Sequence, residues 1–196
     1  MSPTVAQNPA WLDLSRPNLA AHVIDVLEHG SGRDPVVSLS RVGDCDIVVK
    51  DFAPRGFLVR NLIGRWMTAR EARAYRALAG HPHVPQFYGQ VDPFALAVEY
   101  RPGRKMSRKL AGELPEGFAR ELEDAIRGMH ARGVAHLDLR HRTNVMAGPD
   151  GHPILIDFAS AVCFRPGGLA ARILLPLLAR FDLDALRKWK DRLGAR

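Results

Sequence analysis

Three charged residues end apolar runs, at positions where the surrounding pattern calls for buried side chains. Lys50 ends the run IVVK, Asp138 follows VAHL, and Asp157 closes the run PILI. A buried lysine or aspartate without a partner costs several kcal/mol. Lys50 must therefore meet a carboxylate or a bound anion, and Asp157 must meet a cation or a network of hydrogen-bond donors. Only a fold that supplies such partners at the ends of buried strands satisfies this pattern.

The residues from His22 to Tyr100 predict an antiparallel sheet with one main helix. Short β-type runs punctuated by glycine indicate three strands over residues 22–34, 35–41 and 45–52, and two more over 81–92 and 92–100. Between these two sets, the region from Arg55 to Leu78 is rich in helix-forming residues. Within it, Thr68 and Glu71 have the spacing of a capping box at a helix start.

The second half of the chain predicts a mainly helical unit. A composition shift at residues 101–104 marks a linker, and apolar residues at helical spacing indicate a helix from Pro115 to Arg132. Two short strands around a polar loop follow, and the tail from Gly168 to Arg196 is typical of one or two amphipathic helices. The predicted organisation is an N-terminal arm over residues 1–21, a first lobe over 22–100 and a second lobe over 101–196.

Taken in chain order, these residues and elements resemble the set that defines protein kinases. The matching features are a glycine-containing loop over His29–Arg33, Lys50 on the third strand, Glu71 on the next helix, Glu99–Tyr100 at the end of the last strand, His136–Asp138 ahead of Asn144, and Asp157–Ala159 in place of D-F-G. The chain therefore resembles the protein-kinase-like superfamily. Within it, the chain is similar to minimal bacterial and archaeal kinases of the RIO and Bud32 types, and above all to the lipopolysaccharide core (3-deoxy-manno-octulosonic acid) kinases. The resemblance covers about His22 to Val162.

The resemblance implies a fold and a pair of cofactors. The fold is a bilobal α+β protein-kinase-like fold, with an antiparallel five-stranded N-lobe that carries one main helix and a reduced, mainly helical C-lobe with an amphipathic tail. The cofactors are ATP and Mg²⁺. In phosphoryl transfer of this kind, the protein contributes mainly positioning and charge stabilisation.

The resemblance also implies a role for each matching residue. Backbone amides at Gly30 and Gly32 cover the phosphates, and Lys50 holds the α and β phosphates and is oriented by Glu71. The backbone around Glu99 and Arg101 bonds the adenine edge, with Val98 as the gatekeeper behind it. Asp138 accepts the proton of the attacking hydroxyl, and Asn144 and Asp157 hold Mg²⁺. Glu71 has a second interpretation, because as a partner of Thr68 it would only cap its helix.

Several positions depart from the protein-kinase pattern. Leu137 replaces the arginine of H-R-D, one extra residue separates Asp138 from Asn144, and Ala159 replaces the glycine of D-F-G. No A-P-E sequence follows, and two lobes must share 196 residues. The peptide-binding helices of a regulated eukaryotic kinase are therefore not expected. Among the histidines, His136 is expected to form structural hydrogen bonds, and His81 and His83 are expected to be exposed imidazoles in a turn.

Two classes of function fit these residues. The first is a kinase that transfers the γ-phosphate of ATP to a hydroxyl, either of a lipid-linked saccharide or of a protein serine or threonine. The second is a nucleotide-binding pseudokinase that acts as a scaffold or regulatory partner, which the irregular spacing from Asp138 to Asn144 and the short glycine loop would explain.

The net charge of +7 and the pI near 10.0 indicate a polyanionic partner. Nucleic acid is disfavoured because no aromatic stacking motif accompanies the charge. The segment from Arg55 to Trp66 places arginines beside apolar residues, so its apolar face either packs on the protein, which we favour, or makes a peripheral contact with an anionic membrane. The tail has the same two interpretations, of which packing against the second lobe is preferred. Two widely spaced cysteines and the lack of a signal-peptide pattern favour the cytoplasm, including the inner face of its membrane.

Overall fold

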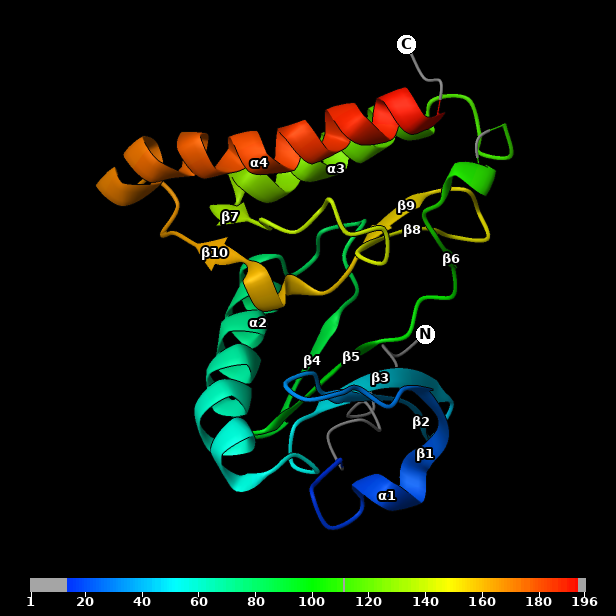
Figure 1. The fold of residues 1–196 in the computed structure, drawn as a ribbon, viewed down its shortest axis with the longest axis vertical. Coiled ribbons are helices and arrows are strands. Elements are labelled where there is room, and N and C mark those ends of the chain that lie inside the picture. Colours follow the sequence, from blue (N-terminus) through cyan, green and yellow to red (C-terminus); the bar gives the residue numbers. More distant parts are fainter. Residues whose placement is uncertain (1–13, 111, 194–196) are drawn as a thin grey trace, which may run out of the picture. The chain divides into compact units, whose positions relative to one another are not determined.

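The computed structural model describes residues 14–110 and 112–193. Trp11, which the predicted N-terminal arm contains, lies outside these residues. The chain has two compact units. The first is Met1–Thr68 with Phe87–Tyr100, and the second is Ala69–Gln86 with Arg101–Arg196. Each unit has its own sheet or sheets and its own helical elements (Figure 1).

The first unit is built on a five-stranded antiparallel sheet in the order β1-β2-β3-β5-β4 (Figure 1). The strands are β1 (Val23–Glu28), β2 (Val36–Val42), β3 (Cys45–Asp51), β4 (Phe87–Asp92) and β5 (Ala95–Glu99). The strand number and the antiparallel arrangement confirm the sequence-based prediction. On one face of the sheet, Ile47, Val49, Ala95 and Ala97 are buried, together with Leu19 of helix α1 (Leu19–His22).

A continuous helical segment begins before Arg65. A π-helical turn (Val59–Gly64) runs directly into α2 (Arg65–Ala77). Thr68 therefore lies inside a helix, and its buried hydroxyl has no hydrogen-bond partner. The capping-box interpretation of Thr68 and Glu71 is wrong, because the helix starts well before Thr68 and leaves no free backbone N–H group for it to cap.

Within the first unit, Gly64 of the π-helical turn packs against Phe52. A Cβ atom at Gly64 would be 2.6 Å from the Cβ of the buried Phe52, so no larger residue fits at this position. The apolar residues of the same segment point away, since Phe57, Leu58, Leu62 and Trp66 are all more than half exposed. Packing of this apolar face on the protein, the interpretation favoured from the sequence, is therefore wrong for these four side chains.

The second unit contains α3 (Phe118–Ala131), α4 (Leu169–Leu193) and two small sheets (Figure 1). One sheet pairs β7 (Val134–Ala135) with β10 (Val162–Cys163), and the other has the order β6-β8-β9, formed by Arg104–Lys105, Val145–Ala147 and Pro153–Leu155. The apolar stripe of α3 is buried as the spacing predicts, and Gly133 follows the helix with a φ of +81°. Short 3₁₀ turns cover Arg108–Leu110 and Phe158–Ser160.

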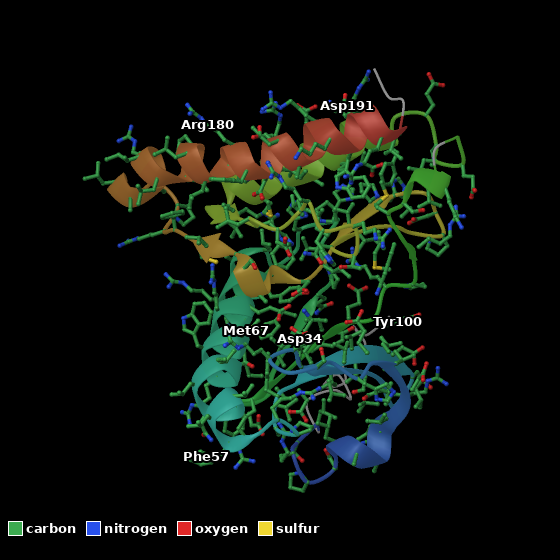
Figure 2. All side chains as sticks on the ribbon, in the orientation of Figure 1. Asp34, Phe57, Met67, Tyr100, Arg180 and Asp191 are labelled. Carbon is green, nitrogen blue, oxygen red and sulfur yellow. The ribbon has the colours of Figure 1, made fainter. Side chains whose placement is uncertain are left out.

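The tail forms the single helix α4, which packs beside α3 (Figure 1). Its C-terminal half buries Ala185, Leu186 and Trp189, which confirms the predicted packing for that half. The N-terminal half departs from the prediction, because Leu169, Ile173, Leu174, Leu177 and Phe181 are exposed. In Figure 2, Arg180 marks the middle of α4 and Asp191 its C-terminal end. No helix within the described residues is long and apolar enough to cross a membrane.

The turn that carries His81 and His83 is present, but its histidines are not both exposed. His81 is buried, its Nε2 atom lies 3.1 Å from the carbonyl oxygen of Ala125, and its Nδ1 atom accepts the backbone N–H of His83 at 3.2 Å. His83 is half-buried, with Nδ1 at 2.9 Å from the carbonyl oxygen of Pro153. The prediction of two exposed imidazoles is therefore wrong, because both rings bond backbone groups of the second unit.

Candidate functional site

The glycine-containing loop is the connection between β1 and β2 in the first unit. Gly30 and Gly32 have φ values of +60° and +54°, in the left-handed region that glycine adopts without cost. A Cβ atom at Gly30 would lie 2.1 Å from the carbonyl oxygen of Pro35, whereas one at Gly32 would meet nothing within 4 Å. The Arg55 guanidinium donates to the carbonyl oxygen of His29, which fixes the base of the loop. Gly30 is therefore required sterically as well as conformationally.

Lys50 lies on the central strand β3, on the face opposite the core of the first unit. It pairs with Val37 on β2 and Leu96 on β5, while Val48, two residues earlier, pairs with Val98. Because cross-strand partners and residues two apart share a face, Lys50 and Val98 lie on the same side of the sheet. The predicted phosphate-binding lysine and the predicted gatekeeper are thus on one surface, formed by strands β2, β3 and β5.

Glu99 and Arg101 lie on either side of the boundary between the two units. Glu99 ends β5 and pairs with Ile47 on β3. The side chain of Arg101 donates from Nη1 to the carbonyl oxygen of Pro82 at 2.5 Å, within the second unit. Only the backbone of Arg101 is thus left for the predicted contact with adenine.

In the second unit, the loop between β7 and β8 brings Asp138 and Asn144 together. The Nδ2 atom of Asn144 donates to Asp138 at two oxygens, the carboxylate Oδ2 at 2.9 Å and the backbone carbonyl at 3.0 Å. Two backbone bonds, from His141 to the Asp138 carbonyl and from Asn144 to the His141 carbonyl, fold the intervening residues into a turn. The extra residue in this loop is therefore absorbed by the turn and does not separate the two side chains.

Asp157 follows strand β9 and precedes the 3₁₀ turn that starts at Phe158. Phe158 is fully buried, with its ring 5.1 Å from the Tyr75 ring and 4.8 Å from the His136 ring. Arg70 holds the end of this segment, because its guanidinium donates to the carbonyl oxygens of Ser160 and Ala161 at 2.5 and 2.7 Å. Glu71, the next residue on α2, is buried in the same unit.

Two residues other than glycine have positive φ values in the described part of the chain, and both belong to this site. They are Leu137, with φ of +69°, and Asp157, with φ of +65°. The left-handed backbone conformation costs a residue with a Cβ atom roughly 1–2 kcal/mol, and such strain persists only where surrounding contacts fix the backbone. Leu137, which precedes Asp138, and Asp157, one of the two predicted metal ligands, are therefore the strained positions.

His136 supports the loop from inside the second unit. It is fully buried, with Nε2 3.0 Å from the carbonyl oxygen of Ile156 and Nδ1 3.4 Å from the backbone nitrogen of Asp138. Burial lowers the pKa of this imidazole, although Asp182, Asp157 and Asp138 act in the opposite direction. A neutral ring that donates from Nε2 and accepts at Nδ1 satisfies both contacts. This geometry fits the structural role expected for His136.

Helix α4 holds the loop at both sides of Asp138. The fully buried Asp182 accepts the backbone N–H groups of His136 and Leu137, each at 2.8 Å, and lies 2.9 Å from Nε2 of His130. On the other side, Nε1 of Trp189 donates to the carbonyl oxygen of Leu139 at 2.9 Å. Sequence reasoning did not find these two residues. The available signal was their spacing, because Asp182 lies on the same helical face as Ala179, Leu186 and Trp189.

The second unit offers oxygen ligands that suit Mg²⁺. The carboxylate of Asp157 and the amide oxygen of Asn144 are the ligand types that this ion prefers, and it usually keeps several waters and binds substrate phosphates as well. Asn144 is oriented through its nitrogen, which donates to Asp138, while its amide oxygen accepts a hydrogen bond from Oγ1 of Thr143 at 3.1 Å. No cluster of three or more histidine, cysteine, aspartate or glutamate side chains suited to a metal was found in the part of the chain that the structure describes. The donor set thus fits a metal shared with a phosphate ligand.

Together, the sheet, the loop and the aspartates define a protein of the protein-kinase-like fold. The Rio2 kinase of Chaetomium thermophilum, solved as an ADP/Mg²⁺–phosphoaspartate complex, matches it with a TM-score of 0.58 and 15% sequence identity, over 91% of this chain and 64% of its own. The RIO-type resemblance found in the sequence is thereby confirmed at the level of the fold.

Two curated plant kinases from Oryza sativa subsp. japonica are similar in sequence. A protein that carries the name cyclin-dependent kinase F-2 is 35% identical over 107 residues, and CBL-interacting protein kinase 4 is 37% identical over 103 residues. These segments cover 45% and 47% of this chain but 32% and 22% of the two relatives. The similarity thus spans about a third or less of the relatives' length. No protein-family model matches the chain.

Proposed function

We propose that the protein is a kinase that transfers the γ-phosphate of ATP to a hydroxyl group, with Mg²⁺ as the metal. The observation that carries the proposal is the fixed carboxylate of Asp138, which accepts Nδ2 of Asn144 at 2.9 Å in a loop that α4 holds on both sides. In the reaction, the acceptor oxygen forms a bond to the γ-phosphorus, the bond to the β-phosphate oxygen breaks, and ADP leaves. Asp138 takes the proton of the attacking hydroxyl.

Most of the residues proposed to bind the nucleotide belong to the first unit. Gly30 and Gly32 would allow the backbone to approach the phosphates, and Lys50 would neutralise their charge. Glu71, which belongs to the second unit, is the residue that the kinase pattern assigns to orient Lys50. Val98 and the backbone at Glu99 and Arg101 would contact the adenine. The ADP and Mg²⁺ bound in the Rio2 structure support nucleotide and metal use in this fold. Mg²⁺ would supply charge neutralisation at the phosphates, and Asp157 and Asn144 are the residues that would hold it.

The acceptor that we favour is a hydroxyl of a lipid-linked saccharide at the inner face of a membrane, where ATP is present. The exposed arginine-rich apolar segment from Arg55 to Trp66 supports this choice, because it would keep the enzyme near such acceptors. A serine or threonine hydroxyl of a protein is the competing acceptor.

The experiment is phosphate transfer from labelled ATP with Mg²⁺, measured with core lipopolysaccharide and, separately, with generic protein acceptors. Asp138→Ala should abolish transfer, and the matched variant Asp150→Asn, which changes an exposed carboxylate of the same unit, should retain it. Labelling of the saccharide alone supports the favoured acceptor, and labelling of protein alone supports the competitor. Absence of labelling above the Asp138→Ala background would refute the enzymatic function.

The pseudokinase is the second candidate. The glycine loop favours it, because Pro35 stands where the G-x-G-x-x-G pattern has its third glycine, and proline has no backbone N–H to offer a phosphate. Under this alternative, ATP with Mg²⁺ raises the melting temperature while no phosphate transfer or ATP hydrolysis is measured. The two measurements together separate the candidates.

A further inference from the structure

We propose that the face formed by Phe57, Leu58, Leu62 and Trp66 binds the surface of an anionic lipid membrane. These four side chains, the docking face, are between 59% and 70% exposed. Single exposed apolar residues are common on soluble proteins, but four on three successive turns of one helical segment form a patch. The proposal does not depend on the kinase activity, because the face belongs to the first unit and includes no residue assigned to the reaction.

The backbone geometry places these residues on one side. Leu58, Leu62 and Trp66 are spaced by four residues, and the turn that joins them is π-helical, with a longer repeat than an α-helix. Gly64 lies on the opposite side, where it fits against Phe52 with no room for a side chain. The segment is thus anchored by its glycine face, and rotation to bury the apolar residues would drive larger side chains into Phe52. Figure 2 shows Phe57 at the beginning of this segment.

The charge of the segment identifies the occupant. From Phe52 to Arg70 the sequence has no acidic residue, and Arg60 and Arg65 lie within the docking face's own turns. Their guanidinium carbons are 6.0 and 5.8 Å from the ring centre of Phe94, and that of Arg60 is also 5.8 Å from the ring centre of Phe57. These stacking contacts keep two cations beside the apolar patch. Anionic headgroups above an apolar layer match this combination, whereas a neutral apolar partner would leave the cations unpaired.

We expect the segment from Phe57 to Trp66 to lie as a helix in the plane of the membrane–water interface. Such helices insert their apolar face about 5–10 Å into the boundary between headgroups and acyl chains. Trp66 is well suited to this boundary, because the amphipathic indole is enriched at the interface between membrane and water. The four apolar residues would enter the boundary, and Arg60 and Arg65 would remain at the level of the phosphates.

The test is binding of the full chain to vesicles of phosphatidylcholine alone and of phosphatidylcholine with a third phosphatidylglycerol. We expect sedimentation only with the anionic vesicles, weaker binding as salt is raised, and a blue shift of Trp66 fluorescence. The shift is measured in a Trp11→Phe background, where Trp66→Phe should still bind and lose the shift, because the remaining Trp189 is buried. Equal binding to both vesicles without salt dependence would overturn the assignment to anionic lipid.

Variants of the docking face and of the two arginines beside it test the location, and all of these positions except the half-buried Arg60 are exposed. The double variant Leu58→Ser with Leu62→Ser should lose most of the binding, and Arg60→Gln and Arg65→Gln should each weaken it roughly fivefold, the effect typical of one basic residue near an anionic surface. The matched control is Leu177→Ser with Phe181→Ser, which removes two exposed apolar residues from α4. A loss of binding in the control as large as in the Leu58 and Leu62 variant would refute the location. Self-association through this face without vesicle binding would refute the lipid and indicate a second copy as the occupant.

Discussion

Asp182, near the middle of α4, accepts the backbone N–H of Leu137 at 2.8 Å. Leu137 has a left-handed conformation and immediately precedes Asp138, so a buried carboxylate stabilises a strained residue next to the proposed base. The tail helix therefore does more than cover the second unit. It sets the backbone that presents Asp138, through Asp182 on one side and through Trp189 on the other.

Replacement of Asp182 by asparagine should lower both stability and turnover. An amide can accept only one of the two backbone N–H groups well, and an unsatisfied buried donor costs about 1–3 kcal/mol. A small displacement of Asp138 should reduce kcat by roughly tenfold to a hundredfold, with little change in the KM for ATP. Steady-state kinetics and urea denaturation measure these effects. Asp191→Asn, at an exposed carboxylate of the same helix, is the control and should change neither. If Asp182→Asn lost stability but kept kcat, the role of Asp182 would be structural only.

The two glycines of the nucleotide loop should respond differently to alanine. Both substitutions place a Cβ atom at positive φ, which destabilises the loop by roughly 1–2 kcal/mol. Gly30→Ala adds a clash with the carbonyl oxygen of Pro35, so it must also deform the loop, whereas Gly32→Ala meets open space. We expect ATP affinity, measured by calorimetry, to fall at least tenfold more for Gly30→Ala. Equal losses would mean that the close contact at Gly30 does not shape the nucleotide site.

The five strands of the first unit and the α3 stripe could be predicted because both depend on local patterns. Alternation of apolar residues determines which face of β3 enters the core, and helical spacing from Phe118 to Met129 determines the buried side of α3. The start of α2 could not be predicted in the same way. Thr68 and Glu71 have capping-box spacing, but the packing of Gly64 on Phe52 extends the helix toward the N-terminus, and such a tertiary contact has no local signal.

Some residues of the candidate site likewise have a local signal in the sequence, and others depend on tertiary contacts. Asp138 and Asp157 could be found because charged residues end apolar runs, and Asn144 could be found from its place after His136–Asp138 in the kinase resemblance. Asp182 could not be distinguished by type from the nearby Asp184. The difference between these two aspartates is their helical face, since Asp182 faces α3 and the loop while Asp184 pairs with Arg187 at the surface. His81 was missed for a related reason, because its burial depends on α3, a distant part of the sequence.

Metal binding should connect Asp157 to nucleotide-induced stability. Binding at about 100 times the Kd adds roughly 2.7 kcal/mol, which for a chain of this size raises the melting temperature by about 5–10 °C. We expect this increase with ATP and Mg²⁺, and a smaller one with ATP and a chelator. In Asp157→Ala the two conditions should give the same melting temperature, and in Asn144→Ala the Mg²⁺ concentration required should rise. A full Mg²⁺ effect in Asp157→Ala would exclude this carboxylate as a metal ligand.

Stability should fall as the pH decreases from about 6.5 toward 4, in part through His81. Burial, together with the nearby charge of Arg132, lowers the pKa of this imidazole from 6.5 to about 4, although the bond to the Ala125 carbonyl acts in the opposite direction. The Nδ1 atom accepts the backbone N–H of His83, which also requires the neutral ring. In this window the unfolded chain binds a proton that the folded chain does not, so protonation favours unfolding and removes up to about 3 kcal/mol. The variant His81→Gln can still donate to the Ala125 carbonyl and carries no titrating group. Denaturation at pH 8 measures the intrinsic cost of the substitution, and at pH 5 the difference from the wild type should shrink. An unchanged difference at the two pH values would contradict the assignment to His81.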